Sequence, residues 1–598
     1  MDDNQIIYPS EPEKITDNAF HYDSFTNGKT LFNKKKGRLP AMGWNSWNAF
    51  GSGNTETLTK IMTDKIVELG LNELGYEYLV LDDGCYKATR INNQLSNEEV
   101  KFPGGFKALS DYIHSKGLKF GMYNDIGTNL CAGAQVGTCG HEKIDAQSYI
   151  NWGVDFLKID NCYYLWDNAT FSNPENARYV FAPNIKDITV KGFGLNTKLS
   201  AVKDGILYGE GAVKTKNYVT GIGTFDGTNT GTTPIGPRSG ELHFNISAPA
   251  DGKYFLTVNY ATSKENGIGE WLQIAAGNGD SSKYFYDYFL PVTKNKETFT
   301  DSPQIEIELK KGENTLRFMN HRRQENTLCS YAAMLEGLQL ACPDNDIVLS
   351  LCEWGKTQPQ NWGYKVGDSW RILNDITFQV GSDGNPGHAA WSDPGTPSVT
   401  SQYNKAVIMD EFAGLDKGWN DPDMLTIGME GLSPVMNKTH FSMWCLMNSP
   451  LMLGLDLRRV QKGDELYNII SNKDLIDLNQ DKLGIQAKRI WTSYKCSEPD
   501  KEYIQDNARA DVLAKPLADG SVAVSVINLS ETDRSQEICI EMNFIKKQLG
   551  IKTPSVFEKA SCFEIVDLWK KTKTTGNCVK TAGLEPCDSL TVKVIPVK

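Results

Sequence analysis

The sequence has no apolar run of about 18 residues, the length that a membrane-spanning helix needs. It has no Cys-x-x-Cys pair, so the usual ligand spacing of a structural zinc site is absent. It also lacks a basic stripe, because the formal net charge is −12 and the isoelectric point is near 5.3. These absences argue against a membrane span, such a metal centre and nucleic acid as a partner, since little would neutralise phosphates.

A secretory signal is not visible either. The chain starts with MDDNQIIYPSEPEKITDN, which lacks a basic segment followed by an apolar one. If a signal peptide has been trimmed, we expect a secreted or cell-envelope protein, and otherwise a cytoplasmic one. The 13 cysteines leave at least one thiol unpaired and do not decide between these compartments.

The chain is long enough, at 598 residues, for two or three domains. From about Arg38 onward, strand-like and helix-like segments alternate, which is typical of a parallel sheet covered by helices. Eight such units predict an α/β fold, a (β/α)8 TIM barrel, with its chemistry at the C-terminal strand ends. The eight predicted strands begin in the segments 41–47, 76–84, 118–127, 155–162, 346–355, 369–376, 419–425 and 449–458.

Two other regions have the alternating pattern and the Gly, Asn and Pro turns of all-β structure. One interrupts the barrel after its fourth strand, and SYAAMLEGLQLAC then resumes a helix. The other follows the barrel and predicts a C-terminal antiparallel β-sandwich. The predicted domains are an N-terminal extension (1–37), the first barrel part (38–175), an inserted β-sandwich (176–328), the second barrel part (329–485) and the C-terminal β domain (486–598).

Polar residues end the fourth predicted strand, VDFLKIDNC, where burial of an unpaired charge would be costly. Lys158 and Asp160 are two residues apart, so in a strand both side chains point to the same face. The lysine would favour an ionised Asp160 and could also bind a hydroxyl. The alternative interpretation is a purely structural ion pair at the strand end.

A second acid is expected from another strand end, and Asp375 in WRILNDI is the candidate, four residues after Arg371. Considered alone, Asp375 would more simply cap a helix. Asp421 and Asp423 flank Pro422, where a simple turn is the alternative. Asp82 and Asp83 end the second strand, and these adjacent carboxylates persist most easily with hydroxyl donors or cations nearby.

Together, the predicted strand ends combine several carboxylates with Lys158, Arg371, Glu353 and tryptophans at positions 44, 47 and 354. Carboxylates accept hydrogen bonds from sugar hydroxyls, and an indole face stacks on the apolar face of a pyranose. Phosphate chemistry would call for glycine-rich loops and cations instead, which we do not find. The pattern therefore favours a carbohydrate site.

At this level the sequence resembles glycoside hydrolase family 27, the α-galactosidases and α-N-acetylgalactosaminidases. The resemblance covers 38–175 and 329–598 and follows six motifs in the family's order: MGWNSWNAF, LDDG, GVDFLKIDNC, LCEWG, SWRILNDI and WNDPDML. It implies the same barrel and C-terminal β domain. It also implies Asp160 as nucleophile, Asp375 as general acid/base, a disulfide between Cys131 and Cys162 beside the nucleophile, and a galactose pocket lined by Trp44, Asp82, Asp83, Tyr123, Lys158, Glu353, Arg371 and Asp423.

The sequence departs from this family in the segment DDGCY. The family usually has a tryptophan soon after the aspartate pair, whereas this chain has Cys85 and Tyr86. Many members pair a cysteine there with one after the first strand, but NAFGSG contains none, so Cys85 could be free. The inserted region resembles carbohydrate-binding modules of families 6 and 35, while a β domain that only walls the site or mediates oligomer contacts is the alternative.

The resemblance implies a retaining exo-α-galactosidase that needs no cofactor and no metal, acts on an α-galactoside and could form a homo-oligomer. Within the family, a β-L-arabinopyranosidase or an α-N-acetylgalactosaminidase is the alternative. A sugar-binding protein on an inactive barrel is the alternative from another class, although the presence of both Asp160 and Asp375 speaks against it. Glu353 matches the position at which galactosidases carry a glutamate and N-acetylgalactosaminidases a small residue.

Overall fold

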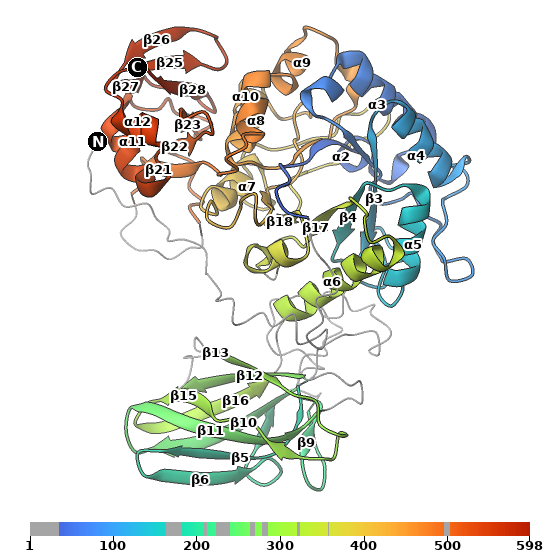
Figure 1. The fold of residues 1–598 in the computed structure, drawn as a ribbon, viewed down its shortest axis with the longest axis vertical. Helices are drawn as coiled ribbons and strands as arrows, with labels where there is room; N and C mark the ends of the chain where they lie inside the picture. Colours follow the sequence, from blue (N-terminus) through green and yellow to red (C-terminus); the bar gives the residue numbers. More distant parts are fainter. Residues whose placement is uncertain are drawn as a thin grey trace.

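The computed structural model describes residues 35–162, 182–208, 212–222, 240–262, 270–277, 285–319, 323–356, 358–495 and 503–597. Figure 1 shows a barrel surrounded by helices, a sandwich set apart from it beyond α6, and a C-terminal β domain beside α7 and α8. This confirms the predicted fold class: a barrel, an insertion after the fourth strand and a C-terminal antiparallel sandwich.

Eight parallel strands form the barrel sheet in the order β19-β18-β17-β4-β3-β2-β1-β20. Leu425, which follows β19, pairs in parallel with Leu453 in β20, so the two ends of this sheet meet. The strands are β1 (Met42–Asn45), β2 (Tyr78–Val80), β3 (Lys119–Asp125), β4 (Phe156–Asp160), β17 (Val348–Cys352), β18 (Ser369–Arg371), β19 (Trp419–Asp421) and β20 (Leu451–Leu453). Each lies within its predicted segment.

The two faces of these strands are buried in different ways. Val80, Phe156 and Met452 form one small cluster with their neighbours in the barrel interior. Leu79 and Leu157, which alternate with them, belong to the large core shared with the helices. Because both faces are buried, the strands are apolar except at their ends.

The helices around the barrel start and end at ordinary signals. Thr55 caps the first long helix by accepting from the Leu58 backbone N–H, and Gly70 ends it at φ 73°. One helix begins at Arg323, earlier than the segment predicted from the sequence. The barrel helices are α2 (Ser46–Phe50), α3 (Glu56–Leu69), α4 (Gly105–Ser115), α5 (Glu142–Trp152), α6 (Arg323–Ala341), α7 (Val399–Ala406), α8 (Pro434–Leu446), α9 (Glu465–Ile470) and α10 (Lys473–Asn479).

The insertion forms two antiparallel sheets around its own apolar core. One sheet has the order β13-β12-β16-β10-β7, and the other is built on β14-β11-β5-β9-β8 with β15 and β6 paired to it. The strands are β5 (Asn184–Gly192), β6 (Leu195–Ser200), β7 (Ile206–Tyr208), β8 (Val213–Lys214), β9 (Val219–Thr220), β10 (Glu241–Ala248), β11 (Gly252–Ala261), β12 (Glu270–Gly277), β13 (Phe285–Leu290), β14 (Thr300–Asp301), β15 (Ile305–Leu309) and β16 (Gly312–Met319).

The C-terminal domain has a six-stranded sheet in the order β21-β22-β23-β28-β25-β26 and a two-stranded sheet, β24-β27. Its strands are β21 (Lys488–Thr492), β22 (Ala510–Pro516), β23 (Val522–Asn528), β24 (Ile538–Glu541), β25 (Phe563–Asp567), β26 (Lys573–Gly576), β27 (Cys578–Thr581) and β28 (Ser589–Pro596). Its helices are α11 (Met542–Leu549) and α12 (Ser555–Lys559).

The predicted domain borders relate to these elements in different ways. The border at 175/176 lies outside the described residues. The border at 328/329 falls inside α6, which already packs on α5 of the barrel, and the border at 485/486 comes just before β21. In the part of the chain that the structure describes, no helix combines the length and the apolarity that crossing a membrane requires.

Candidate active site at the C-terminal strand ends

The acid at the end of β4 lies on the inner face of the barrel, as the spacing predicts. Lys158 donates from Nζ to Asp82 Oδ2 at the end of β2, at 2.7 Å. The same Asp82 oxygen accepts from Asn45 Nδ2 at 2.8 Å. Three strand ends, β1, β2 and β4, are therefore joined by one carboxylate.

Asp160 is buried at the C-terminal end of β4, inside the opening of the barrel that these strand ends surround. Its Oδ2 accepts from the Tyr123 hydroxyl at 3.2 Å, and its Oδ1 accepts from the Asn161 backbone N–H at 2.9 Å. Burial raises the pKa of Asp160 to about 7, with Lys158 opposing the rise and Asp375 adding to it. A carboxylate held near neutrality by burial and by a second acid is typical of catalytic sites.

A second buried acid, Asp125, is one that the sequence analysis did not single out. It ends β3 and pairs with Asp160 across β3 and β4. Its carboxylate accepts backbone N–H groups from Gly127 and Cys162, each at 2.6 Å. Burial, followed by the nearby Asp160, raises the pKa of Asp125 to about 8.

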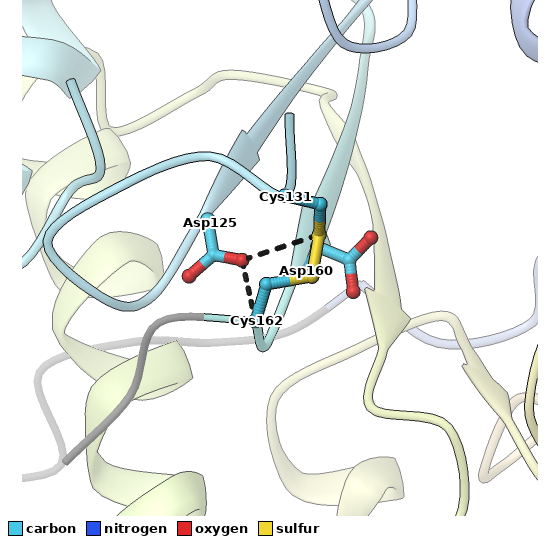
Figure 2. A group of neighbouring side chains, drawn as sticks. All are labelled: Asp125, Cys131, Asp160 and Cys162. Atoms are coloured by element: carbon cyan, nitrogen blue, oxygen red, sulfur yellow. Dashed lines mark hydrogen bonds between the residues drawn. A yellow bond between two sulfur atoms is a disulfide. The ribbon is translucent and has the colours of Figure 1, made fainter. Parts of the chain in front are cut away.

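Figure 2 shows this acid pair around a disulfide. Cys131 and Cys162 are bonded, which confirms the pairing implied by the family resemblance. The donor atoms of these four residues lie within 4.8 Å of one another, but the bond leaves no thiolate to bind a metal. The group is therefore better explained as a disulfide that braces two buried carboxyls than as a metal centre.

Asp83 connects this disulfide to β2. Its Oδ1 accepts from the Gly84 backbone N–H at 2.6 Å, and its Oδ2 accepts from the Ala132 N–H at 2.7 Å. Because Ala132 follows Cys131, the disulfide fixes the loop that orients Asp83. Burial raises the pKa of Asp83, and these two backbone donors oppose that rise.

The opposite wall is organised by a buried arginine. Arg371 Nη2 lies 2.7 Å from Asp423 Oδ2 and 3.1 Å from Asp375 Oδ1. The Asp375 side chain is 53% exposed, whereas Arg371 is 3% exposed. Asp375 therefore faces solvent at the rim, and the next described helix, α7, is capped by Ser398 rather than by Asp375. Asp423 has φ 77°, a left-handed conformation that is uncommon for residues other than glycine.

Glu353 is fully buried just after the end of β17. The segment then turns sharply: Trp354 has φ 61°, and a Cβ on Gly355 would lie 2.1 Å from the Ile372 carbonyl oxygen. Lys356 Nζ lies 4.3 Å from the centre of the Trp354 ring and donates to the Asn161 carbonyl at 2.9 Å. This turn joins the end of β17 to the end of β4.

Trp44 does not join this group. It is in register with Leu79 and Leu453, which belong to the core under the helices, and its Nε1 donates to the Leu455 carbonyl at 2.9 Å. Trp47 instead packs against the interior cluster of the barrel. The structure thus offers Trp47, and not Trp44, as the tryptophan near the mouth, because residues after β1 enter a helix and no longer alternate.

The atypical DDGCY segment is also accounted for. Cys85 is a free, buried thiol, as its missing partner suggested. Tyr86 is buried and donates from its hydroxyl to the Tyr123 carbonyl at 2.8 Å. Tyr86 therefore supports β3 behind Tyr123.

Family models match most of this framework. A model described as alpha galactosidase A matches residues 39–177 and 397–481, and one described as the alpha galactosidase C-terminal beta sandwich domain matches 507–594, together more than half of the chain. This chain belongs to the α-galactosidase family of glycoside hydrolases. The matches include Asp160 and Asp423, while Glu353, Arg371 and Asp375 lie between the matched parts.

Individual relatives agree with this assignment. The chain is 27% identical to alpha-galactosidase 2 of Arabidopsis thaliana over 77% of this chain and 72% of that protein. It is 26% identical to alpha-galactosidase A of Cellvibrio japonicus over 89% of this chain and 86% of that protein. A solved α-galactosidase from Saccharomyces cerevisiae matches with a TM-score of 0.58 at 20% identity, covering 96% and 99% of the two chains, which supports the fold.

Proposed function

We propose that this family member is a retaining exo-α-galactosidase, which removes terminal α-D-galactose from oligosaccharides or polysaccharides through a covalent intermediate on Asp160. The observation that carries the proposal is the contrast between two acids at one mouth. Asp160 is buried under Lys158 and Tyr123, while Asp375 is half exposed on the arginine that also binds Asp423. A retaining glycosidase uses two carboxyls at one site as nucleophile and general acid/base, and the exposed one here, Asp375, is open to the leaving group and to water.

In this scheme the ionised Asp160 attacks the anomeric carbon as the glycosidic bond breaks. Asp375 donates its proton to the leaving oxygen, so that the aglycone departs as a neutral alcohol. Asp375 then removes a proton from water, which attacks the same carbon and releases Asp160. Two displacements preserve the configuration of the sugar.

The remaining groups suit recognition of a neutral hexose. Asp82 and Asp83 offer acceptor oxygens to sugar hydroxyls, and Lys158 offers a donor beside them. Glu353 is fully buried just after β17, and in this proposal its carboxylate accepts from the 2-hydroxyl and leaves little volume for an acetamido group. These contacts favour galactose over N-acetylgalactosamine.

The direct test uses nitrophenyl α-galactoside and follows the newly released sugar by NMR. We expect α-galactose as the first product, and β-galactose as the first product would refute retention. A 2-fluorogalactosyl inhibitor should label the peptide that contains Asp160, and label on another residue would refute that assignment. The matched nitrophenyl β-L-arabinopyranoside and α-N-acetylgalactosaminide should be poorer substrates, and a preference for either would replace the proposed specificity.

A further inference from the structure

A polar cleft of about 400 Å³ lies beside the acid/base loop, between the entrance to α7 and the segment that leads into β22. Its size is in the range of ligand pockets. The side facing the barrel includes Leu373, Thr396 and Ser401, and the opposite side includes Tyr503 and Gln505. Two parts of the chain about a hundred residues apart therefore form one concave surface.

The floor of this cleft is held together by side-chain amides. Asn507 Nδ2 donates to Ser392 Oγ at 3.0 Å and to Thr400 Oγ1 at 2.9 Å. Asn404 Nδ2 donates to Asn507 Oδ1 at 3.1 Å, and Arg509 Nη2 donates to Asn404 Oδ1 at 2.5 Å. This network fixes the segment that carries Tyr503 and Gln505 against the barrel.

Two contacts connect the cleft to Asp375. Arg371 Nη2, which binds Asp375, also donates to the carbonyl of Leu373 in the cleft wall at 3.1 Å. Gln402, in α7, donates from Nε2 to the carbonyl of Asn374 at 2.5 Å. Asp375, the residue proposed to protonate the leaving oxygen, is thus only two positions in the sequence from Leu373 in the cleft wall.

The lining is suited to a neutral sugar. It consists mainly of hydroxyl and amide side chains, two prolines and the Tyr503 ring, which could stack on a pyranose. Its one carboxylate, Asp393, already accepts the backbone N–H groups of Gly395 and Thr396 at 2.7 and 3.0 Å. An anionic or strongly cationic group would find little complementary charge among these residues.

We propose that this cleft binds the second sugar of the leaving group, so that the enzyme is built for oligosaccharides rather than for small aryl galactosides. The inference deepens the function proposed above and rests on it for the role of Asp375. Nitrophenol is too short to use such a site fully, whereas a di- or trisaccharide leaving group would reach it. The cleft would therefore contribute to kcat/KM for the longer substrate alone.

The test fills the cleft by Thr396→Trp, since Thr396 is an exposed residue of its lining. Thr572→Trp, in the exposed turn between β25 and β26, is the matched control. With raffinose, we expect Thr396→Trp to lower kcat/KM at least about tenfold, while nitrophenyl α-galactoside changes less than about twofold. Tyr503→Ala should produce the same selective loss, and the control should change neither substrate.

A binding measurement tests the cleft independently of the proposed catalytic mechanism. Sucrose and mannotriose, which lack galactose, are titrated into the unmutated protein and both tryptophan variants by NMR. Weak binding that Thr396→Trp abolishes and Thr572→Trp retains would support the cleft even if no galactoside were hydrolysed. Absence of binding by both probes, together with equal losses on raffinose and the nitrophenyl substrate, would overturn it.

Discussion

Replacing Asp160, the proposed nucleophile, should make the protein inactive and, at neutral pH, more stable. Asp160 has a pKa of about 7 in the folded protein against an ordinary value of 3.8, mainly because of burial. A raised carboxyl pKa means that the folded state favours the protonated form. Asp160→Asn mimics the protonated form, so it removes the free-energy cost of burying a negative charge at the end of β4.

The size of the effect follows from the two pKa values. Ionising Asp160 at pH 7 costs the folded state on the order of 4 kcal/mol, taking 1.36 kcal/mol per pKa unit over the difference between 3.8 and about 7. The amide keeps only part of the hydrogen bonding with Tyr123 and Asn161, so a net gain of roughly 1–3 kcal/mol remains. The gain should grow from about pH 4 to pH 7 and vanish below pH 4.

Asp511, a buried aspartate whose pKa is lowered instead of raised, supplies the control. Burial acts to raise the pKa of Asp511, but Arg509 and Arg489 hold it below its ordinary value. Its stabilising contribution is present above the ordinary pKa and disappears as pH falls, so Asp511→Asn should lower stability at pH 7. Both variants are compared by urea unfolding and Tm at pH 4 and pH 7. If Asp160→Asn lost stability at pH 7 as Asp511→Asn does, Asp160 would be a structural ion-pair residue.

Three further results are expected. Asp375→Ala should slow poor leaving groups at least about a hundredfold more than dinitrophenol, which needs little protonation, and equal losses in kcat/KM would remove Asp375 from that role. In the unmutated protein we expect kcat/KM to be roughly a hundredfold higher for nitrophenyl α-galactoside than for nitrophenyl α-N-acetylgalactosaminide, and Glu353→Ser should narrow this ratio. Comparable kcat/KM values for the two substrates in the unmutated protein would contradict the interpretation of Glu353. Cys131→Ala should raise KM for nitrophenyl α-galactoside several-fold because the Ala132 loop no longer fixes Asp83. A lower Tm with unchanged KM would instead make the disulfide purely structural.

The sequence predicted the ends of the barrel strands well because that is where apolar runs stop at charged residues. Lys158 and Asp160 were placed on one face by alternation alone, and Asp82 was found beside them. The family resemblance placed Trp44 in the pocket, whereas in the structure it is in register with Leu79 and Leu453 and belongs to the core under the helices. Asp125 was missed because one aspartate at a strand end, without a neighbouring cation, gives no local signal.

The cleft beside Asp375 could not be predicted from the sequence either, for a different reason. Its walls come from residues near 396 and near 503, which share no motif and meet only when the C-terminal domain packs against α7. The amide network through Asn404 and Asn507 depends on that packing and has no period in the sequence. Such surfaces appear only once the tertiary arrangement is known.

The position of the inserted sandwich has a consequence for how the chain is made. Roughly 160 residues separate Cys162 from Arg323, where α6 begins, and the β4 edge is completed only when β17 emerges still later. At a synthesis rate of about 5–20 residues per second, this is a delay of roughly 10–30 s. During this interval the edge of β4 that later pairs with β17 has no partner strand. An unpaired strand edge is prone to aggregation. Once α6 arrives, its Tyr331 hydroxyl donates to the carbonyl of Ile159 at 3.2 Å, so the strand that carries Asp160 is secured only after the whole insertion has been made.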